Sequence, residues 1–274
     1  MRSKNSISLF TTAYNLARKA DLLEVRWLRS TFVSSYFLYK RFHEDPFGGL
    51  VRRMPEIFLG GDILDIGANI GYTACVFAGA LTPRSKVYAF EPDRSSYALL
   101  EETIRRKKLC ASIEAINFAV GNCDGHVEFW HNRAHSADHR VVTEKFKTLR
   151  PDAIETTTIP MTSVDAFVKA RSLQGVSFIK IDVQGYELGV CEGMQQTLER
   201  FPETRVCLEY SPEGLVELGF EPEKVLEFFR IRGYRIYVLT REGIQAAPDN
   251  STVQRSVEKA GYVDLICSRV VLVS

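Results

Sequence analysis

The sequence predicts an α/β fold with a mostly parallel sheet, and two observations lead to this prediction. From Asp62 onward, apolar runs of strand length alternate with amphipathic segments of helix length, which is the pattern of parallel strands joined by crossover helices. The 274 residues are 45% hydrophobic and 25% charged, a composition that can bury a large core. The length suits one large domain or two small ones. Disorder and a collagen-like fibre are excluded.

The first 55 residues are predicted to form a helical cap. Between positions 7 and 43, apolar residues recur at spacings of three and four, which predicts two amphipathic helices. Residues 45–49 break this pattern, and Pro55 ends the segment. We therefore divide the chain into a cap over residues 1–55 and a main domain over residues 56–274.

Seven segments of the main domain are strand candidates, because each is an apolar run bounded by Gly, Pro or polar residues. They are Ile63–Ile66, Lys86–Phe90, Ser112–Val120, Ser177–Val183, Arg205–Tyr210, Arg235–Leu239 and Val263–Arg269. The helix candidates are a short segment at Leu50–Met54, then Tyr72–Gly79, Ser95–Lys107, Val164–Arg171, Glu187–Arg200 and Pro222–Ile231. The last two strands follow each other without an obvious helix, which predicts an antiparallel hairpin at the sheet edge with Pro248–Asn250 in its loop.

Residues 121–159 interrupt the alternation of strands and helices. Asn122–Gly125 is typical of a hairpin turn, and a polar stretch rich in histidine follows. We expect this insertion to form a strand pair and an active-site lid. Within it, His131, His135 and His139 follow the spacing i, i+4, i+8, which would align them on one helical face.

Three interpretations of these histidines stay open: a metal site, a catalytic or substrate-binding role for one of them, and a plain surface loop. No cysteine joins them at ligand spacing, and the residues between them are polar. We therefore predict no metal ligand here.

The overall charge of +1 provides no field that would hold a nucleic-acid backbone, so nucleic acid is not an expected partner. Residues 1–60 nevertheless carry ten Lys/Arg and five Asp/Glu, a net charge of +5. This basic, aromatic segment is expected to pack on the sheet domain. Alternatively, it covers an acceptor pocket and attracts an anionic or carrier-bound substrate, forms a homodimer contact, or attaches to a membrane surface.

Six cysteines without a C-x-x-C pair, most of them inside apolar runs, predict buried free thiols in a reducing cytosol. No apolar run typical of a signal peptide follows the basic start. The longest uncharged stretch near the start, Ser30–Tyr39, is about half of what a bilayer crossing requires. We therefore expect a cytoplasmic protein without a transmembrane helix.

The first strand candidate leads into a ligand loop, in which an acidic residue, a small-residue turn and a helix start follow one another over 65–73. Glycines in the turn let a backbone approach a bound molecule, and the helix start offers N–H groups to a carboxylate or phosphate. The pattern G-x-G-x-x-G fails at Asn69 and Tyr72, which disfavours dinucleotide binding. Glu91 follows Asp65 by 26 positions, close to the spacing at which a carboxylate binds ribose hydroxyls.

Three blocks resemble the FkbM-type methyltransferases, a branch of the Rossmann-like enzymes that use S-adenosylmethionine. The blocks are Asp65-Ile-Gly-Ala-Asn-Ile-Gly-Tyr-Thr73, Phe90-Glu91-Pro92, and Ile179-Lys-Ile-Asp182-Val-Gln-Gly185-Tyr-Glu187 leading to Gly193, with weaker support from Ala119-Val120-Gly121 and Pro160-Met-Thr-Ser-Val-Asp165. The likeness spans the greater part of the chain. One departure is Gln184, where the family usually has Glu.

The resemblance implies a class I methyltransferase fold, with a seven-stranded sheet and S-adenosylmethionine as cofactor. It places Asp65, Gly67, Asn69 and Gly71 around the methionine part, Glu91 on the ribose, Asn117 to Ala119 by the adenine and Asp182 opposite the reacting methyl group. The remaining cofactor-binding candidates are Ala68, Tyr72, Thr73 and Pro92.

Methylation of an alcohol requires a general base, and the candidates are Asp182, Glu209, His131 and His135. We rank Asp182 first, because a carboxylate there also complements the charge of a sulfonium; capping of the following helix is its alternative role. Asp182 and Glu209 are also suitable ligands for a divalent metal, which we do not predict.

We therefore expect an enzyme that methylates a hydroxyl of a small-molecule acceptor, a sugar or another secondary metabolite. A nicotinamide-dependent oxidoreductase is one alternative, disfavoured by the broken glycine pattern. A non-catalytic partner subunit that binds the cofactor is the other, disfavoured by the intact Asp182 and glycine loop.

Overall fold

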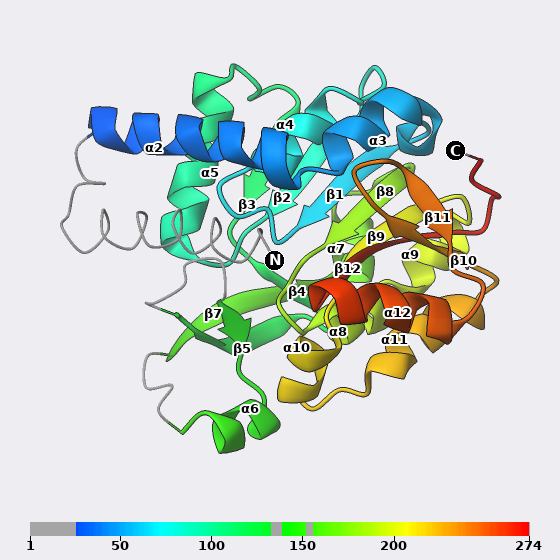
Figure 1. Cartoon of the computed structure of the whole chain (residues 1–274). Coiled ribbons are helices and arrows are strands. Elements are labelled where there is room, and N and C mark those ends of the chain that lie inside the picture. Colours follow the sequence, from blue (N-terminus) through cyan, green and yellow to red (C-terminus); the bar gives the residue numbers. More distant parts are fainter. Residues whose placement is uncertain (1–25, 133–138, 152–155, 274) are drawn as a thin grey trace.

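The computed structural model of the chain describes residues 26–132, 139–151 and 156–273, and its centre is an eight-stranded sheet (Figure 1). The strand order is β11-β10-β12-β9-β8-β1-β2-β3. In chain order these strands are β1 (Asp62–Ile66), β2 (Val87–Phe90), β3 (Ile113–Ile116), β8 (Val176–Ile181), β9 (Arg205–Tyr210), β10 (Arg235–Leu239), β11 (Ile244–Ala246) and β12 (Val263–Ser268). The run from β3 to β9 is parallel, whereas β12 is antiparallel to both β9 and β10.

The α/β class is confirmed. The sheet is mixed, with its parallel pairings confined to the run from β3 to β9, and the count of seven strands is wrong, because β11 adds an eighth strand at the edge beside β10. The expected terminal hairpin is also corrected. Strands β10 and β12 do pair antiparallel, but β12 lies inside the sheet, between β9 and β10. Helix α12 (Asn250–Ala260) connects β11 to β12 where a loop was expected, and Asp249 caps its start by accepting a hydrogen bond from the backbone of Thr252.

Helices cover both faces of the large sheet, because its strands are apolar at successive positions and so present buried side chains to both faces. In β1, Ile63 packs with α3 and α4 on one face, and Leu64 and Ile66 pack with the helices on the other. Figure 1 shows α3 and α4 above the sheet, α5 beside β3, and α11 and α12 below the sheet. The helices of the main domain are α4 (Tyr72–Ala78), α5 (Arg94–Arg106), α6 (Glu144–Leu149), α7 (Val164–Ala170), α8 (Glu187–Glu192), α9 (Gln195–Arg200), α10 (Pro212–Glu217), α11 (Pro222–Arg230) and α12.

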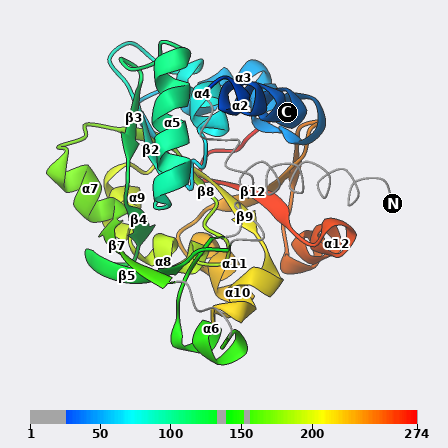
Figure 2. The same cartoon turned by 90° about the vertical axis from the view of Figure 1, so that its left-hand side faces the viewer.

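A second, four-stranded sheet accounts for the interruption of the alternation, with the order β4-β7-β5-β6. Its strands are β4 (Ala119–Gly121), β5 (Gly125–Trp130), β6 (Arg140–Val141) and β7 (Thr156–Ser163). The single strand expected over Ser112–Val120 is therefore two strands, and the chain changes sheets between β3 and β4. Figure 2 shows β5 and β7 on the opposite side of the molecule from α2 and α3.

The described part of the N-terminal segment comprises α2 (Arg26–Tyr39), a π-helical turn (Lys40–Glu44), α3 (Phe47–Arg53) and a 3₁₀ turn (Pro55–Phe58). The first of the two helices expected between residues 7 and 43 lies outside the described residues. Val33 of α2 packs against Ile70 and Leu99, with Tyr36 and Phe37 around them. The described part of the segment therefore packs against the loop after β1 and against α5, in line with the expectation that it packs on the sheet domain.

Two further expectations concern thiols and membranes. All six cysteines are free, and Cys191, Cys207 and Cys267 are buried, whereas Cys110 and Cys123 are exposed. Within the described residues, no helix combines the length and the apolar character that crossing a bilayer demands.

Candidate active site

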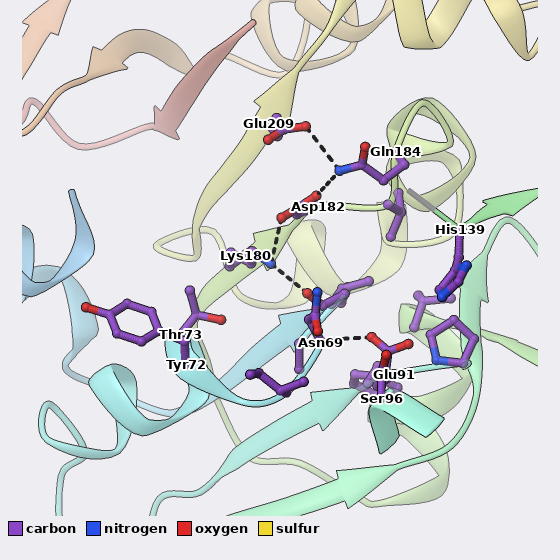
Figure 3. A pocket seen from close by; sticks show the side chains of 18 of the residues that line it. Asn69, Tyr72, Thr73, Glu91, Ser96, His139, Lys180, Asp182, Gln184 and Glu209 are labelled. Carbon is purple, nitrogen blue, oxygen red and sulfur yellow. Dashed lines mark hydrogen bonds and ion pairs between the residues drawn. The ribbon is translucent and has the colours of Figure 1, made fainter. Parts of the chain in front are cut away.

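A cavity of about 480 Å³ lies at the carboxyl ends of the parallel strands, where open α/β sheets bind their ligands. Its floor comes from the segments that follow β1, β2, β8 and β9. The second sheet contributes one wall through Phe129 and Val141, and the N-terminal segment contributes another through Tyr36 and Lys40. Figure 3 shows the polar side chains that face this space.

The loop after β1 has a backbone path that few residues tolerate. Gly67, Asn69 and Gly71 have φ of +79°, +49° and +89°, values that glycine adopts readily and asparagine tolerates. A Cβ on Gly67 would lie 1.8 Å from the carbonyl oxygen of Asp182, so a close backbone approach requires glycine there. Gly67, Ala68, Asn69, Tyr72 and Thr73 all line the cavity, and this expected part of the site is thus assembled in one place.

Gly71 and Asp65 act behind the cavity rather than on its surface. A Cβ on Gly71 would lie 2.6 Å from Leu100 of α5, so this glycine permits helix packing. Asp65 is fully buried; its Oδ2 accepts a hydrogen bond from Thr73 Oγ1 at 2.7 Å, and its Oδ1 lies 3.5 Å from Lys180 Nζ. Burial raises the pKa of Asp65, while Lys180 opposes that shift. Asp65 therefore orients cavity-lining side chains.

Glu91 follows β2 and is held by backbone groups. Its Oε2 accepts a hydrogen bond from the Asn69 N–H at 2.9 Å, and its Oε1 accepts one from the Asp93 N–H at 2.8 Å. Burial raises the pKa of Glu91 to about 8, partly offset by these hydrogen bonds. Asn117 lies behind the cavity and donates to the carbonyl oxygens of Glu91 and Pro92. Pro92 and Ala119 line the cavity beside Glu91.

On the other side of β1, Asp182 follows β8 and points into the cavity (Figure 3). Its side chain is 34% exposed and lies 3.4 Å from Lys180 Nζ, while Gln184 Nε2 donates to its Oδ1 at 2.8 Å. Gln184 also donates to Glu209 Oε1 at 3.3 Å. A continuous line of polar contacts thus connects Glu209 to Lys180 through Gln184 and Asp182.

Lys180 is a site residue that the sequence reasoning missed. It lines the cavity, is buried, and donates from Nζ to the Gly67 carbonyl oxygen at 2.9 Å. Burial alone would favour a neutral amine, but Asp182 and Asp65 raise the pKa of Lys180, so the charged form is retained. A charged residue inside an otherwise apolar strand was the available sequence indication, because buried lysines occur almost only when paired.

Asp264 is a second residue that was missed. It stands opposite Glu209 in the antiparallel pairing of β9 with β12, and both residues line the cavity. Burial raises the pKa of Glu209 well above its usual range, and Asp182 and Asp264 add to the shift. Burial and Asp182 raise the pKa of Asp264 to about 7. This end of the cavity therefore concentrates three carboxyl groups around one lysine.

The histidines do not form the expected helical face. His131 follows β5 and His139 precedes β6, and the antiparallel pairing of these strands brings the two rings to 5.5 Å between centroids. His131 is engaged away from the cavity, by Asp93 at Nδ1 (3.1 Å) and Thr157 at Nε2 (2.7 Å). His139, which was one of the three aligned histidines but not a candidate base, lines the cavity. The candidate base His135 lies outside the described residues.

Comparisons with known proteins agree with this geometry. Residues 65–236 match the family described as the methyltransferase FkbM domain. The chain is 25% identical over 196 residues to the hexuronic acid methyltransferase AglP of Haloferax volcanii, covering 70% of this chain and 75% of AglP. It is 29% identical over 167 residues to the 2-O-methyltransferase NoeI of Sinorhizobium fredii, covering 57% of this chain and 65% of NoeI.

A solved structure shows the same fold. The methyltransferase FkbM of Methylobacillus flagellatus superposes with a TM-score of 0.50 and 16% identity, over 85% of this chain and 50% of that one. The family match includes the loop after β1, Glu91 and Asp182, which are the cavity residues on which the sequence resemblance depends. The chain therefore belongs to the FkbM methyltransferase family and is an S-adenosylmethionine-dependent methyltransferase.

Proposed function

We propose that this enzyme transfers the methyl group to a hydroxyl of a sugar. The observation that carries the proposal is the position of Asp182, a partly exposed carboxylate in the same cavity as Glu91, with the Gly67 loop between them. The names of the relatives support the chemistry, since one specifies a hexuronic acid and the other a 2-O position.

The cavity residues fit S-adenosylmethionine. The buried carboxyl group of Glu91 suits the paired hydroxyls of a ribose, and the apolar wall of Phe118, Ala119 and Val120 suits a flat purine. A volume of about 480 Å³ is within the range of small-molecule sites. When bound, the cofactor supplies a methyl group on a positively charged sulfur.

The acceptor hydroxyl loses its proton as its oxygen takes the methyl group, and we assign that proton to Asp182. Glu209 is a weaker candidate, because burial raises its pKa well above the ordinary value and so favours the protonated form, which cannot accept the proton. His131 does not line the cavity, and both of its nitrogens contact protein groups. Asp182 is thus the best placed base among the described candidates.

Lys180 and Gln184 position this base. Lys180 Nζ bridges the Gly67 carbonyl oxygen and Asp182, so the loop after β1 and the base share one anchor. Gln184 donates to both Asp182 and Glu209. Because methyl transfer depends on alignment of acceptor and donor, these contacts fix where the hydroxyl must lie.

We further propose that the N-terminal segment is a cap over the acceptor end. Tyr36, Lys40 and Asp45 line the cavity there, and Asp45 Oδ2 accepts a hydrogen bond from Tyr72 at 2.9 Å. The carboxylate of Asp182 disfavours an acceptor carboxylate or phosphate beside the reacting hydroxyl. An anionic group on the acceptor, or an anionic carrier, would therefore lie toward Lys40.

Titration calorimetry with S-adenosylhomocysteine tests cofactor binding, with NADH as the control ligand. We expect saturable binding of the first and none of the second. The acceptor is then sought by incubating the enzyme with radiolabelled S-adenosylmethionine and methyl glycosides of hexuronic acids and neutral hexoses. Labelled product from any of these sugars, located on oxygen by mass spectrometry, supports the proposal.

Binding of NADH instead of S-adenosylhomocysteine by folded protein would overturn the proposed function and favour an oxidoreductase. Tight binding of S-adenosylhomocysteine with transfer to an amine or thiol, but not to any sugar, would overturn the acceptor class alone. The two parts of the proposal are thus separable.

A further inference from the structure

A second cavity, of about 540 Å³, lies where α2 and α3 of the N-terminal segment pack on α4 and α5. Figure 2 shows these four helices together in the upper part of the molecule. Asp45 and Tyr72 line this second cavity and the active-site cavity alike. The hydrogen bond that Tyr72 donates to Asp45, at 2.9 Å, is therefore part of the wall between the two cavities.

The lining of the second cavity is apolar inside and basic at the rim. Its apolar side chains are Val33, Phe37, Leu38, Val51 and Val76, and its basic side chains are Arg41, Arg52, Arg106 and Lys107. The apolar residues other than Leu38 are buried or half-buried, whereas all four basic residues are exposed. A molecule in this cavity would thus contact hydrocarbon inside and positive charge at the opening.

The positive charge at the rim is not neutralised by the protein around it. Arg41, Arg52 and Lys107 form no ion pair with a carboxylate of the described residues. Asp45 is the acidic residue in the lining, and its carboxylate already accepts two hydrogen bonds from backbone N–H groups at the start of α3 and one from Tyr72. The second cavity therefore keeps an excess of positive charge.

The apolar and basic side chains are interleaved around the opening. The ammonium group of Lys107 lies 4.6 Å from the ring centroid of Phe37, a cation–π contact that holds this charge where the apolar interior meets the rim. Leu38 and Phe42 are 59% and 58% exposed, and Arg41 stands between them in the chain. Positive charge beside exposed apolar side chains is the combination with which proteins bind anionic lipids.

We infer that the second cavity binds a lipid phosphate, with the apolar chain inside and the phosphate at Arg41, Arg52 and Lys107. Guanidinium groups present paired N–H donors that match phosphate oxygens. A phosphate without a chain would leave the apolar lining uncovered, and a neutral lipid would leave the charge of the rim unpaired. The inference goes beyond the proposed function and does not depend on it.

Calorimetry of the full-length protein with dihexanoyl phosphatidic acid, a lipid phosphate that is monomeric in water, tests the cavity. Inorganic phosphate and dihexanoyl phosphatidylcholine are the control ligands, and we expect saturable binding of the phosphatidic acid alone. Arg52→Glu should weaken this binding roughly 10–30-fold, because it reverses a charge at the rim. Leu38→Ser should weaken it roughly 3–10-fold through lost apolar contact. Arg255→Glu, at an exposed position on α12, is the matched control and should bind as the wild type does.

A lipid phosphate can come from a bilayer or be free in solution, and sedimentation with vesicles distinguishes these sources. The vesicles are phosphatidylcholine with and without phosphatidic acid, at about 0.15 M salt, where weak surface attraction is screened. Cosedimentation with the anionic vesicles alone, weakened by Arg52→Glu, would make a bilayer the source. Binding of the monomeric lipid without cosedimentation would make a free lipid phosphate the source. Either result supports the inference.

Several outcomes would overturn the inference. The first is no binding of dihexanoyl phosphatidic acid, or equal binding by the wild type and Arg52→Glu. Equal affinity for inorganic phosphate would reduce the cavity to a simple anion site. Cosedimentation with anionic vesicles without binding of the monomeric lipid would indicate general attraction to a charged surface. A dimer that Leu38→Ser dissociates, in a protein that binds no lipid, would make a second copy of the chain the occupant.

The same preparations separate this inference from the proposed function. Because a wall separates the two cavities, Arg52→Glu should bind S-adenosylhomocysteine as the wild type does. Loss of lipid binding with normal S-adenosylhomocysteine binding would then concern the second cavity alone. Absence of S-adenosylhomocysteine binding in a protein that binds the lipid phosphate would overturn the proposed function and leave this inference standing.

Discussion

The two ends of the cavity hold their carboxyl groups in different ways. At one end, both oxygens of Glu91 accept hydrogen bonds from backbone N–H groups, of Asn69 and Asp93. At the other end, Asp182 contacts the side chains of Lys180 and Gln184 and is 34% exposed. Backbone groups are fixed by the sheet, whereas side chains adjust. This difference agrees with the proposal that the first end binds the cofactor and that the second end exchanges a proton.

The sharpest test of this difference is Asp182→Asn. Removing the proposed base should lower turnover about 1000-fold, while affinity for S-adenosylhomocysteine stays within about twofold, because the amide keeps the size of the side chain. Turnover would be measured with an acceptor from the sugar screen and affinity by calorimetry. Near-normal turnover would show that the proton goes elsewhere.

The stability of the folded protein should also depend on Lys180, which lies at the end of the cavity that holds Asp182. Lys180→Met leaves Asp65 and Asp182 without their shared partner, and we expect a loss of about 3–5 kcal/mol in the free energy of unfolding. Urea denaturation monitored by circular dichroism measures it. Lys169→Met, at an exposed position on α7, should change that free energy by less than about 0.5 kcal/mol. Equal effects of the two variants would contradict the central role of Lys180.

At the backbone-held end, Glu91→Ala should act on affinity. Loss of the hydrogen bonds to the ribose should weaken S-adenosylhomocysteine binding about 100-fold, equivalent to about 2.7 kcal/mol. At saturating S-adenosylmethionine, turnover should fall much less than in Asp182→Asn. If Glu91→Ala binds normally but loses turnover, the assignment of the two ends is reversed.

The smallest expected effect is a pH dependence of stability without cofactor. Burial raises the pKa of Glu91 to about 8 from an ordinary 4.5, so the folded protein holds a proton that the unfolded chain releases. This contribution is complete below about pH 4.5 and is lost as the pH rises through 8. Glu91→Gln removes it, so the fall in unfolding free energy between pH 5 and pH 8 should shrink by roughly 1–3 kcal/mol.

Urea titrations of the wild type and Glu91→Gln at pH 5, 6.5 and 8 give this comparison. Glu209, Asp264 and Glu187 also have raised pKa values, so both proteins should lose stability as the pH rises. Parallel curves for the two proteins would mean that Glu91 is already ionised in the cofactor-free fold.

The sequence predicts the elements of the large sheet well where an apolar run has clear ends. Strands β9 and β10 have the expected bounds, and β1, β2 and β8 differ from them by one or two residues. The failures have physical causes. The run from Ile113 to Val120 is continuous in the sequence, so nothing local marks the change from one sheet to the other. Helix α12 has Val253 as its one buried residue, so its apolar stripe was too narrow to recognise.

One helix was expected over Glu187–Arg200, and two are present. The break falls at Gly193, where a Cβ would lie 2.0 Å from the carbonyl oxygen of Gly121. The cause is a contact with the second sheet, which lies about 70 positions earlier in the chain. A contact between residues so far apart in the chain cannot be predicted from the local sequence around Gly193.

The residues of the candidate site likewise fall into two groups: those that the sequence predicts and those that depend on tertiary contacts. Glu91 and Asp182 follow strands in recognisable blocks, so their place at one edge of the sheet was predictable. Asp264 and His139 enter the cavity only through tertiary structure: the first because β12 runs antiparallel beside β9, and the second because β6 folds back on β5. The spacing of residues along the chain does not reveal the pairing of β12 with β9 or that of β6 with β5.

The close approach of Gly67 to the carbonyl oxygen of Asp182 has a consequence for how such an enzyme changes over time. It joins the loop after β1 and the loop that carries the proposed base through main-chain atoms, so we expect side-chain replacements at the rim to leave the relative position of these two loops unchanged. Tyr36, Lys40 and Tyr262 line the cavity without taking part in that contact. If the proposed function holds, we expect mutations at these positions to change the acceptor while the transfer chemistry is kept, which makes them the first positions to randomise in engineering specificity.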